Sequence, residues 1–233
     1  MQRDVIGEGP DGFNAEGLGT LRNQVLGQLR CPADAEVTVE VPAFTVIAAG
    51  VFAAFMERNN FRPEDFAGSS DRQIARRFHA AELPHGLREE LEDVIADFDG
   101  PVVVRPSSVM EAKLERSFGG VYAAKVLPNQ GQDMDRRRRR LADAVKLVWA
   151  STYFGDAVNW RLGAGQQVES EQMAVVIQRA VGAVHGDRFY PTISAVARSY
   201  NHYPAPGNEP DEGVVTLALG FGSVIGEGHT WSY

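Results

Sequence analysis

The sequence has 233 residues, of which 44% are hydrophobic, and its formal net charge at pH 7 is −8. This length can supply one or two cores, and no stretch approaches the roughly 20 apolar residues of a membrane span. The acidic balance argues against nonspecific nucleic-acid binding, because a phosphate backbone attracts clustered cations in excess. One cysteine, Cys31, excludes an internal disulfide framework. With no secretory signal at the start, we expect a cytoplasmic protein.

Apolar spacing in the first hundred residues predicts four helices and two strands. The helices are expected at 15–30, 50–59 and 71–80 and from 84 through 95, and the strands at 37–41 and 44–48. Ser70 or Asp71 can cap the third helix, and Pro84 fits the first turn of the fourth.

The rest of the chain continues to mix strands and helices. We expect a buried strand at 101–104, a strand-like segment at 121–127, a helix at 141–153, and sheet at 173–181, 190–198 and 214–219. This mixture predicts an α/β (α+β) fold of two lobes, 1–112 and 113–233, with flanking helices on a mixed sheet.

Arg105 is the most informative single residue. It follows the predicted strand 101–104 and precedes a turn rich in hydroxyl groups and glycine. Open α/β sheets bind ligands at the carboxyl ends of their strands, and a guanidinium can hold phosphate oxygens bidentately. An arginine in this position is also typical of a surface ion pair, so the spacing alone leaves both interpretations open.

The motifs around Arg105 resemble those of a known family. Arg105-Pro-Ser-Ser-Val-Met-Glu111 and Phe118-Gly-Gly-Val-Tyr122 are similar to the nucleotide-binding domain of phosphoenolpyruvate synthase and pyruvate phosphate dikinase. Further similar segments occur in the same order through Met173-Ala-Val-Val-Ile-Gln178 to Glu227-Gly228. The resemblance implies an ATP-grasp-type fold in which two lobes hold ATP.

The resemblance also implies roles for individual residues. It places Arg105 on the phosphates of ATP as the catalytic residue, and Glu227 beside Mg²⁺, for which a carboxylate is a suitable oxygen ligand. Adenine is expected at the segment from Gln178 to Val181. The residues that it implies contact the nucleotide are Asn14, Arg105, Ser107, Gly119, Gly120, Gln178, Ala180 and Val181.

Some positions depart from the family pattern. Asn14, in Gly12-Phe-Asn-Ala-Glu-Gly-Leu18, stands where the family carries a lysine that meets the ATP phosphates, and Arg22 is the nearest later cation on that predicted helix. Ala124 replaces a threonine, and Pro106 replaces a serine. Losing one preorganised phosphate-stabilising donor typically slows a reaction by about 10²–10³.

Three functions therefore stay open. The first is the ATP-binding domain of a dikinase-like phosphotransferase that lacks the phosphohistidine and pyruvate domains and cannot make phosphoenolpyruvate alone. The second is a degenerate, catalytically inactive ATP-grasp module that acts as a binding or regulatory subunit. The third is a separate ATP-binding subunit of a split dikinase that phosphorylates some other small molecule, together with a separate protein or domain that carries the phosphohistidine.

Other conspicuous residues have ordinary interpretations. The five arginines at 136–140 are expected on a solvated helix face or at a lobe contact, with Asp133 and Asp135 before them. The five histidines lack metal-site spacing and are expected to be surface or packing residues.

Overall fold

The computed structural model describes residues 5–29, 37–114, 120–129, 133–167 and 171–222. Its contacts divide the chain into two compact units, Met1–Ala180 and Val181–Tyr233. The boundary that we predicted after residue 112 falls within the first unit, and the division into two lobes that hold ATP stays a prediction.

The first unit contains a five-stranded mixed sheet. The strands lie in the order β1-β2-β5-β3-β4 and comprise β1 (Val5–Ile6), β2 (Phe44–Ile47), β3 (Val102–Ser108), β4 (Lys125–Leu127) and β5 (Met173–Arg179). Only the β1–β2 pair is parallel, while β2–β5, β5–β3 and β3–β4 are antiparallel. The central strand β5 is buried from Met173 to Gln178, as its unbroken apolar run predicts.

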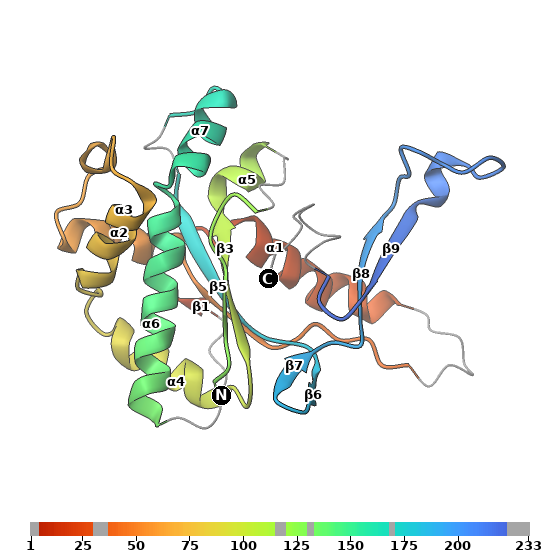
Figure 1. Cartoon of the computed structure of the whole chain (residues 1–233), viewed down its shortest axis with the longest axis horizontal. Coiled ribbons are helices and arrows are strands. Elements are labelled where there is room, and N and C mark those ends of the chain that lie inside the picture. Colours follow the sequence, from red (N-terminus) through yellow and green to blue (C-terminus); the bar gives the residue numbers. More distant parts are fainter. Residues whose placement is uncertain (1–4, 30–36, 115–119, 130–132, 168–170, 223–233) are drawn as a thin grey trace. The chain divides into compact units, whose positions relative to one another are not determined.

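Four helices cover one face of this sheet (Figure 1). They are α2 (Ala49–Arg58), α3 (Asp71–Ala80), α4 (Leu87–Asp97) and α6 (Met134–Ser151). Aromatic rings fill the core between them, and the centroids of Phe55 and Trp149 lie 4.9 Å apart. Offset or tilted ring pairs of this kind add stability beyond the area that they bury.

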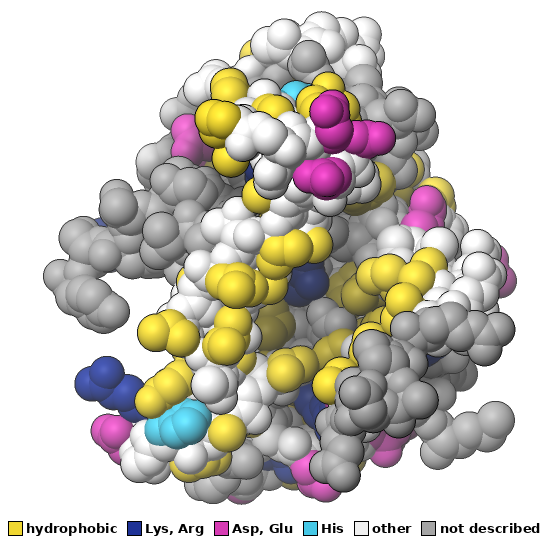
Figure 2. Space-filling model, turned by 90° about the vertical axis from the view of Figure 1, so that its right-hand side faces the viewer, with side chains coloured by type: hydrophobic (Ala, Val, Ile, Leu, Met, Phe, Trp, Pro, Cys, Tyr) yellow, Lys and Arg dark blue, Asp and Glu magenta, His cyan; other side chains and the backbone are white. Residues whose placement is uncertain are grey.

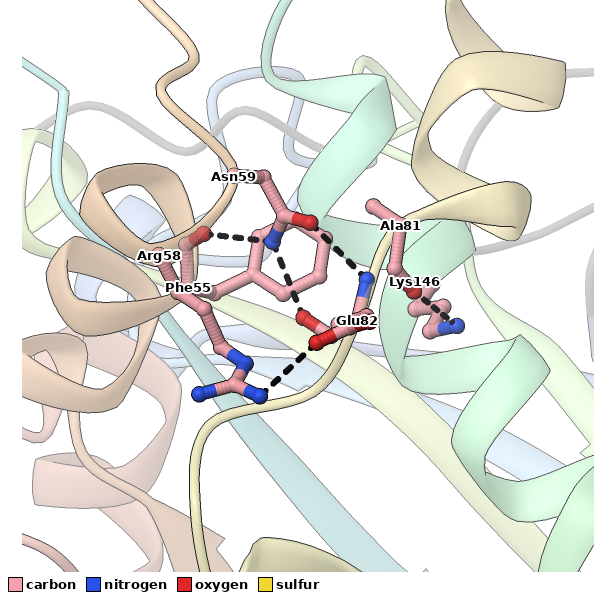
Figure 3. Close-up of polar contacts among 6 residues, drawn as sticks. All are labelled: Phe55, Arg58, Asn59, Ala81, Glu82 and Lys146. Atoms are coloured by element: carbon pink, nitrogen blue, oxygen red, sulfur yellow. Dashed lines mark hydrogen bonds and ion pairs between the residues drawn. The ribbon is translucent and has the colours of Figure 1, made fainter.

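Polar contacts fasten the ends of these helices to one another (Figure 3). The Asn59 amide donates to the carbonyls of Phe55, at 2.8 Å, and Glu82, at 2.9 Å, while its oxygen accepts from the Glu82 amide at 2.8 Å. The Lys146 ammonium of α6 donates to the Ala81 carbonyl at 2.6 Å. These bonds tie the end of α2 and the side of α6 to the segment that follows α3, and the Phe55 carbonyl also accepts from the Asn59 backbone amide at 3.3 Å.

Helix α1 (Gly12–Thr20) covers the opposite face of the sheet. It continues through a π-helical turn (Leu21–Val25) and a 3₁₀ turn (Leu26–Gln28). Its apolar contacts join a second, smaller core made of Ala15, Phe44, Val46, Ala49, Val109, Ala174 and Val176. The short α5 (Val109–Leu114) follows β3, and α7 (Gly155–Gly163) follows α6.

The second unit consists of two hairpins. They are β6 (Ala183–His185) with β7 (Arg188–Tyr190), and β8 (Ile193–Arg198) with β9 (Val214–Leu219). None of its described residues, 181–222, is buried. Leu217 and Leu219 are 64% and 86% exposed on one face of β9. Hydrophobic side chains are also conspicuous at the surface of the molecule in Figure 2.

The structure confirms the mixed α/β fold and most of the predicted elements, with several corrections. Residues 37–41 form no strand. The helix predicted at 15–30 begins at Gly12, and its later apolar residues, such as Leu21 and Val25, are exposed rather than buried. Pro84 precedes α4 instead of lying in its first turn, and the helix predicted at 141–153 spans Met134–Ser151. The elements β1, α5, α7 and β6 were not predicted. Within the described ranges, no helix has the length and apolar character that crossing a membrane requires.

Candidate functional site

Side-chain alternation places two of the predicted site residues, Arg105 and Gln178, on the sheet face that α1 covers. Successive residues of a strand point to opposite faces, and directly opposed residues share a face. Gln178 lies opposite both Phe44 of β2 and Val103 of β3, and Arg105 lies opposite Val176. Arg105 and Gln178 therefore lie on the same face as the smaller core.

A hydrogen bond joins these two residues across the strands. Arg105 Nη1 donates to Gln178 Oε1 at 3.3 Å. Gln178 is 8% exposed and Arg105 is half-buried. The strand that carries Arg105 runs on to Ser108, so Arg105 lies within β3 and not at its end as we predicted. Ser107 and Ser108 are therefore part of the same strand, and α5 begins at the next residue, Val109.

The first turn of α1 is bonded directly to β3. Ser107 is fully buried, and its hydroxyl donates to the Asp11 carbonyl at 2.7 Å and accepts from the Ala15 amide at 3.0 Å. The Asn14 amide donates to the Pro106 carbonyl at 2.9 Å. Asn14 therefore contacts the residue that follows Arg105, and the Asn14 and Ser107 side chains both bind the protein backbone here.

Gly12 allows this close approach. Its φ of +77° lies in the left-handed region, and a Cβ at this position would overlap the Ser107 carbonyl. Only glycine meets both conditions without strain. The close packing of α1 against β3 therefore explains why a glycine stands at position 12 of the predicted nucleotide motif.

The other predicted residues lie at different places. Gly120 lies in an exposed turn before β4, with a φ of +78°. Ala180 follows β5, and its amide donates to the Pro101 carbonyl at 2.9 Å. Val181 is the first residue of the second unit. Gly119 and Glu227 lie outside the described residues.

A buried polar network, which the sequence analysis did not find, lies at the end of β3. Glu171, 4% exposed, accepts from the hydroxyls of Ser108, at 2.9 Å, and Tyr122, at 2.5 Å. Arg161, fully buried, donates to the Tyr122 oxygen at 3.3 Å and to the Thr152 carbonyl. Tyr122 thus links a buried carboxylate to a buried guanidinium.

Burial shifts the pKa of two groups near this end of the sheet. The pKa of the Tyr122 hydroxyl is raised well above its usual value, first by burial and then by the adjacent Glu171 carboxylate. Burial also raises the pKa of the Asp11 carboxyl. Ser108 and Tyr122 had a signal in the sequence, since they belong to the Arg105–Glu111 and Phe118–Tyr122 motifs, whereas Arg161 and Glu171 lie in no motif that we recognised.

The described residues offer little for a metal ion. They contain no group of three or more His, Cys, Asp or Glu side chains that could hold one. A hollow of about 310 Å³ lies elsewhere in the first unit, lined by Phe66, Tyr153, Val158 and their neighbours. Its one charged lining residue is Glu64, so it lacks a cation for phosphate binding.

The described histidines are all exposed. His79 lies 3.1 Å from the Asp143 carboxylate, and His185 stacks on Tyr190. The arginines at 136–140 lie on α6, where Arg137 donates to the Ile95 carbonyl and Arg138 contacts Asp135. These contacts agree with the surface and packing roles that we expected.

A mixed sheet with flanking helices, carrying an arginine on the strand that leads to a serine pair, is consistent with an ATP-grasp-like domain. The family described as pyruvate phosphate dikinase, AMP/ATP-binding domain, matches residues 21–230 of the chain. The chain belongs to this family, which confirms the resemblance. Asn14 precedes the matched residues, so its correspondence to a family lysine stays a prediction. Among curated proteins, none matches the chain with significant similarity.

Proposed function

We propose that the chain binds ATP, as Mg-ATP, with its phosphates at Arg105 on the α1 face of the sheet. The observation that carries this proposal is the Arg105–Gln178 bond across β3 and β5, in a member of an AMP/ATP-binding family. The bond helps to orient the guanidinium, and the amide itself adds no charge. Each charge-assisted hydrogen bond from a guanidinium to phosphate contributes about 1.5–3 kcal/mol.

The segment from Gln178 through Ala180 to Val181 is the proposed adenine contact. Two backbone amides in this segment already serve the sheet, because Arg179 donates to the Ala43 carbonyl and Ala180 to the Pro101 carbonyl, each at 2.9 Å. Recognition of the base edge at Ala180 would therefore use its carbonyl oxygen as an acceptor. The gain from adenine is expected to be smaller than that from the phosphates.

Mg²⁺ enters this proposal as the cation of Mg-ATP. The described residues do not assemble a metal site, and the predicted ligand, Glu227, lies outside them. We therefore assign no described protein ligand to the metal. Ser107, Gly119 and Gly120 complete the proposed phosphate environment, with Ser107 acting through the position of α1.

A second function is favoured by one observation. The Asn14 side chain, which the resemblance places where a lysine meets phosphate, ties α1 to the Pro106 carbonyl. The Asn14 side chain is neutral and is bonded to the backbone, so it brings no positive charge to the nucleotide. This supports a degenerate module that binds without catalysing phosphoryl transfer and acts as a binding or regulatory subunit.

If the site is active, its reaction is phosphoryl transfer from ATP to an acceptor histidine on another domain or partner protein. The four described histidines are exposed, and none lies beside Arg105 in sequence or strand register. Transfer would break the bond from the phosphoryl phosphorus to its bridging oxygen in ATP and form a bond from that phosphorus to the acceptor nitrogen. Arg105 would stabilise the negative charge of the transferred group.

Calorimetric titration with Mg-ATP tests the binding proposal. We expect the wild type to bind and Arg105→Ala to lose at least about tenfold in affinity, which corresponds to about 1.4 kcal/mol. Circular dichroism should show that the variant is folded. Arg139→Ala, an exposed change on α6 across the sheet, is the matched control and should bind like the wild type. An unchanged Kd in Arg105→Ala would remove this residue from the site.

Asn14→Lys separates the two functions. If the site lacks only the cation of the family's lysine, Asn14→Lys should strengthen ATP binding even though the bond to the Pro106 carbonyl is lost. If the wild type gives no heat and only Asn14→Lys binds, the degenerate module is the better description. Binding by both, with only a modest gain, favours a working nucleotide site.

A further inference from the structure

A second surface of the first unit is hollowed and lies on the helix side of the sheet, opposite the face that carries Arg105. Helix α6 packs against α3, which lies beside it in Figure 1, and against the edge strand β4. A hollow of about 380 Å³ lies between α3 and α6, and another of about 340 Å³ lies between α6 and β4. Asp143 and Leu147 of α6 line both hollows, so the two are continuous and are called the α6 surface below.

Cations outnumber carboxylates on the α6 surface. Asp143 is the one carboxylate that lines the hollows, and it lies 3.1 Å from the His79 ring. Within the described ranges, four of the five lysine and arginine side chains that line the hollows form no side-chain hydrogen bond or ion pair; they are Arg72, Arg76, Lys125 and Arg140. The whole chain has a net charge of −8, so this excess of positive charge is local.

The positions of two of these arginines are unfavourable for the helix itself. Arg72 and Arg76 lie one turn apart on α3, and like charges at this spacing destabilise a helix. Arg72 also lies in the first turn, where the helix dipole disfavours a cation. The adjacent carboxylate, Asp71, accepts from the Gly155 amide of α7 at 2.9 Å instead. Positions that break such local rules are typical of functional surfaces, and a bound anion would offset their cost.

The floor of each hollow is apolar. Ala75 and Leu147 are half-buried in the first hollow, and Leu127 and Ala144 are buried in the second. Apolar side chains that project from a partner protein can fill such hollows, while carboxylates beside them pair with the surrounding cations. A nucleic-acid backbone presents phosphates and sugars without projecting apolar groups, and a flat bilayer surface does not enter a hollow. The combination therefore favours a protein partner.

We propose that the α6 surface binds an acidic segment of a partner protein. Apolar side chains of that segment occupy the two hollows, and its Asp or Glu side chains pair with Arg72 and Arg76 at one end and with Lys125 and Arg140 at the other. A guanidinium holds a carboxylate bidentately, which makes arginine well suited to this role. The proposal does not depend on nucleotide binding, because Arg105 lies on the opposite face of the sheet.

The test uses a synthetic amphipathic peptide of glutamate and leucine, about 14 residues long, titrated into the full chain and followed by fluorescence anisotropy. A peptide with lysine in place of glutamate is the control for charge. Arg76→Glu and Lys125→Glu reverse one charge in each hollow, and each should weaken binding roughly tenfold or more. Arg198→Glu reverses the charge of an exposed arginine on β8 and should change the affinity less than about twofold. Circular dichroism should show that all three variants are folded.

Several results would overturn the proposal. These are failure of the wild type to bind the acidic peptide, equal binding of the lysine peptide, and affinity that does not change in Arg76→Glu and Lys125→Glu. Equal losses in Arg198→Glu would show an effect of net charge rather than a contact at the α6 surface. Displacement of the peptide by an equal concentration of tripolyphosphate would show a general anion site, and tighter binding to phosphatidylserine vesicles would show a membrane-binding surface. Either outcome would replace the protein partner.

Discussion

Arg105 and Gln178 lie on adjacent antiparallel strands and are joined by a bond from Nη1 to Oε1 at 3.3 Å. The amide is neutral, so this bond adds no charge of its own beside the guanidinium. A charge introduced at residue 178 should therefore change how strongly Arg105 attracts a bound anion.

Gln178→Glu is expected to weaken Mg-ATP binding by tenfold or more. A carboxylate in place of the amide would pair with Arg105, and at 8% exposure it would be poorly screened by water. Gln178→Met, which removes the bond without adding charge, should have a smaller effect. Calorimetric Kd values measure both, and equal losses in the two variants would contradict the charge argument.

Gly12→Ala should lower the free energy of unfolding by more than about 2 kcal/mol. The left-handed backbone at φ +77° penalises any Cβ, and the methyl group would overlap the Ser107 carbonyl. Gly17→Ala is the matched control on the same helix, where a Cβ meets no atom within 4 Å. We expect Gly17→Ala to stabilise the chain by about 0.5–1 kcal/mol, because alanine is the better helix former. Urea unfolding of both variants measures the difference.

The helices could be predicted from sequence where apolar spacing and capping agreed. In α3, the side chain of Gln73 accepts from the Ser70 amide at 2.9 Å, so Ser70, one of the two capping residues that the sequence offered, marks the start of the helix. Residues 37–41 alternate like a strand but form no ladder with any described strand. Alternation describes a residue's fit to a sheet, whereas the existence of a strand depends on a partner that the local sequence does not contain.

The site was predictable only where a motif preceded it. Arg105 and Gln178 came from motif resemblance, and strand register then brought them together. Arg161 and Glu171 lie in no motif, and they meet only because Tyr122, 39 and 49 residues away from them, lies between them. Contacts over such separations are products of the tertiary fold, and one sequence carries no local signal for them.

Asn59→Asp is expected to destabilise the fold by about 2–3 kcal/mol. The change replaces the donor that reaches the Phe55 and Glu82 carbonyls with an anionic oxygen, and so leaves both acceptors facing a negative charge (Figure 3). Arg58→Ala is the control, since the neighbouring Arg58–Glu82 ion pair at 2.7 Å is solvent-exposed and should contribute less than about 1 kcal/mol. Similar midpoints for the two variants in urea would show that the Asn59 bonds contribute no more than a surface ion pair.

Asp11→Asn should raise the melting temperature at neutral pH. Burial raises the pKa of the Asp11 carboxyl above 3.8, so the folded state binds this proton more tightly than the unfolded state does. The ionised carboxylate therefore opposes folding once the pH exceeds its folded pKa, and the stability that protonation supplies is lost as the pH rises. The advantage of Asp11→Asn should shrink as the pH falls toward 3.8. An advantage that stays constant across this range would point to a cause other than ionisation.

Tyr122→Phe should destabilise the chain by about 1–3 kcal/mol, because it removes one donor from the buried Glu171 carboxylate and one acceptor from the buried Arg161. Tyr200→Phe, an exposed change, is the control and should stay within about 0.5 kcal/mol of the wild type in urea.

The network also predicts a spectroscopic result. Since burial and Glu171 raise the Tyr122 pKa, this phenol should stay protonated at pH 10, where ordinary tyrosines are half ionised. The tyrosinate absorbance of the folded wild type and of Tyr122→Phe should therefore be equal at that pH, and a larger absorbance in the wild type would show that the hydroxyl is accessible and the network open.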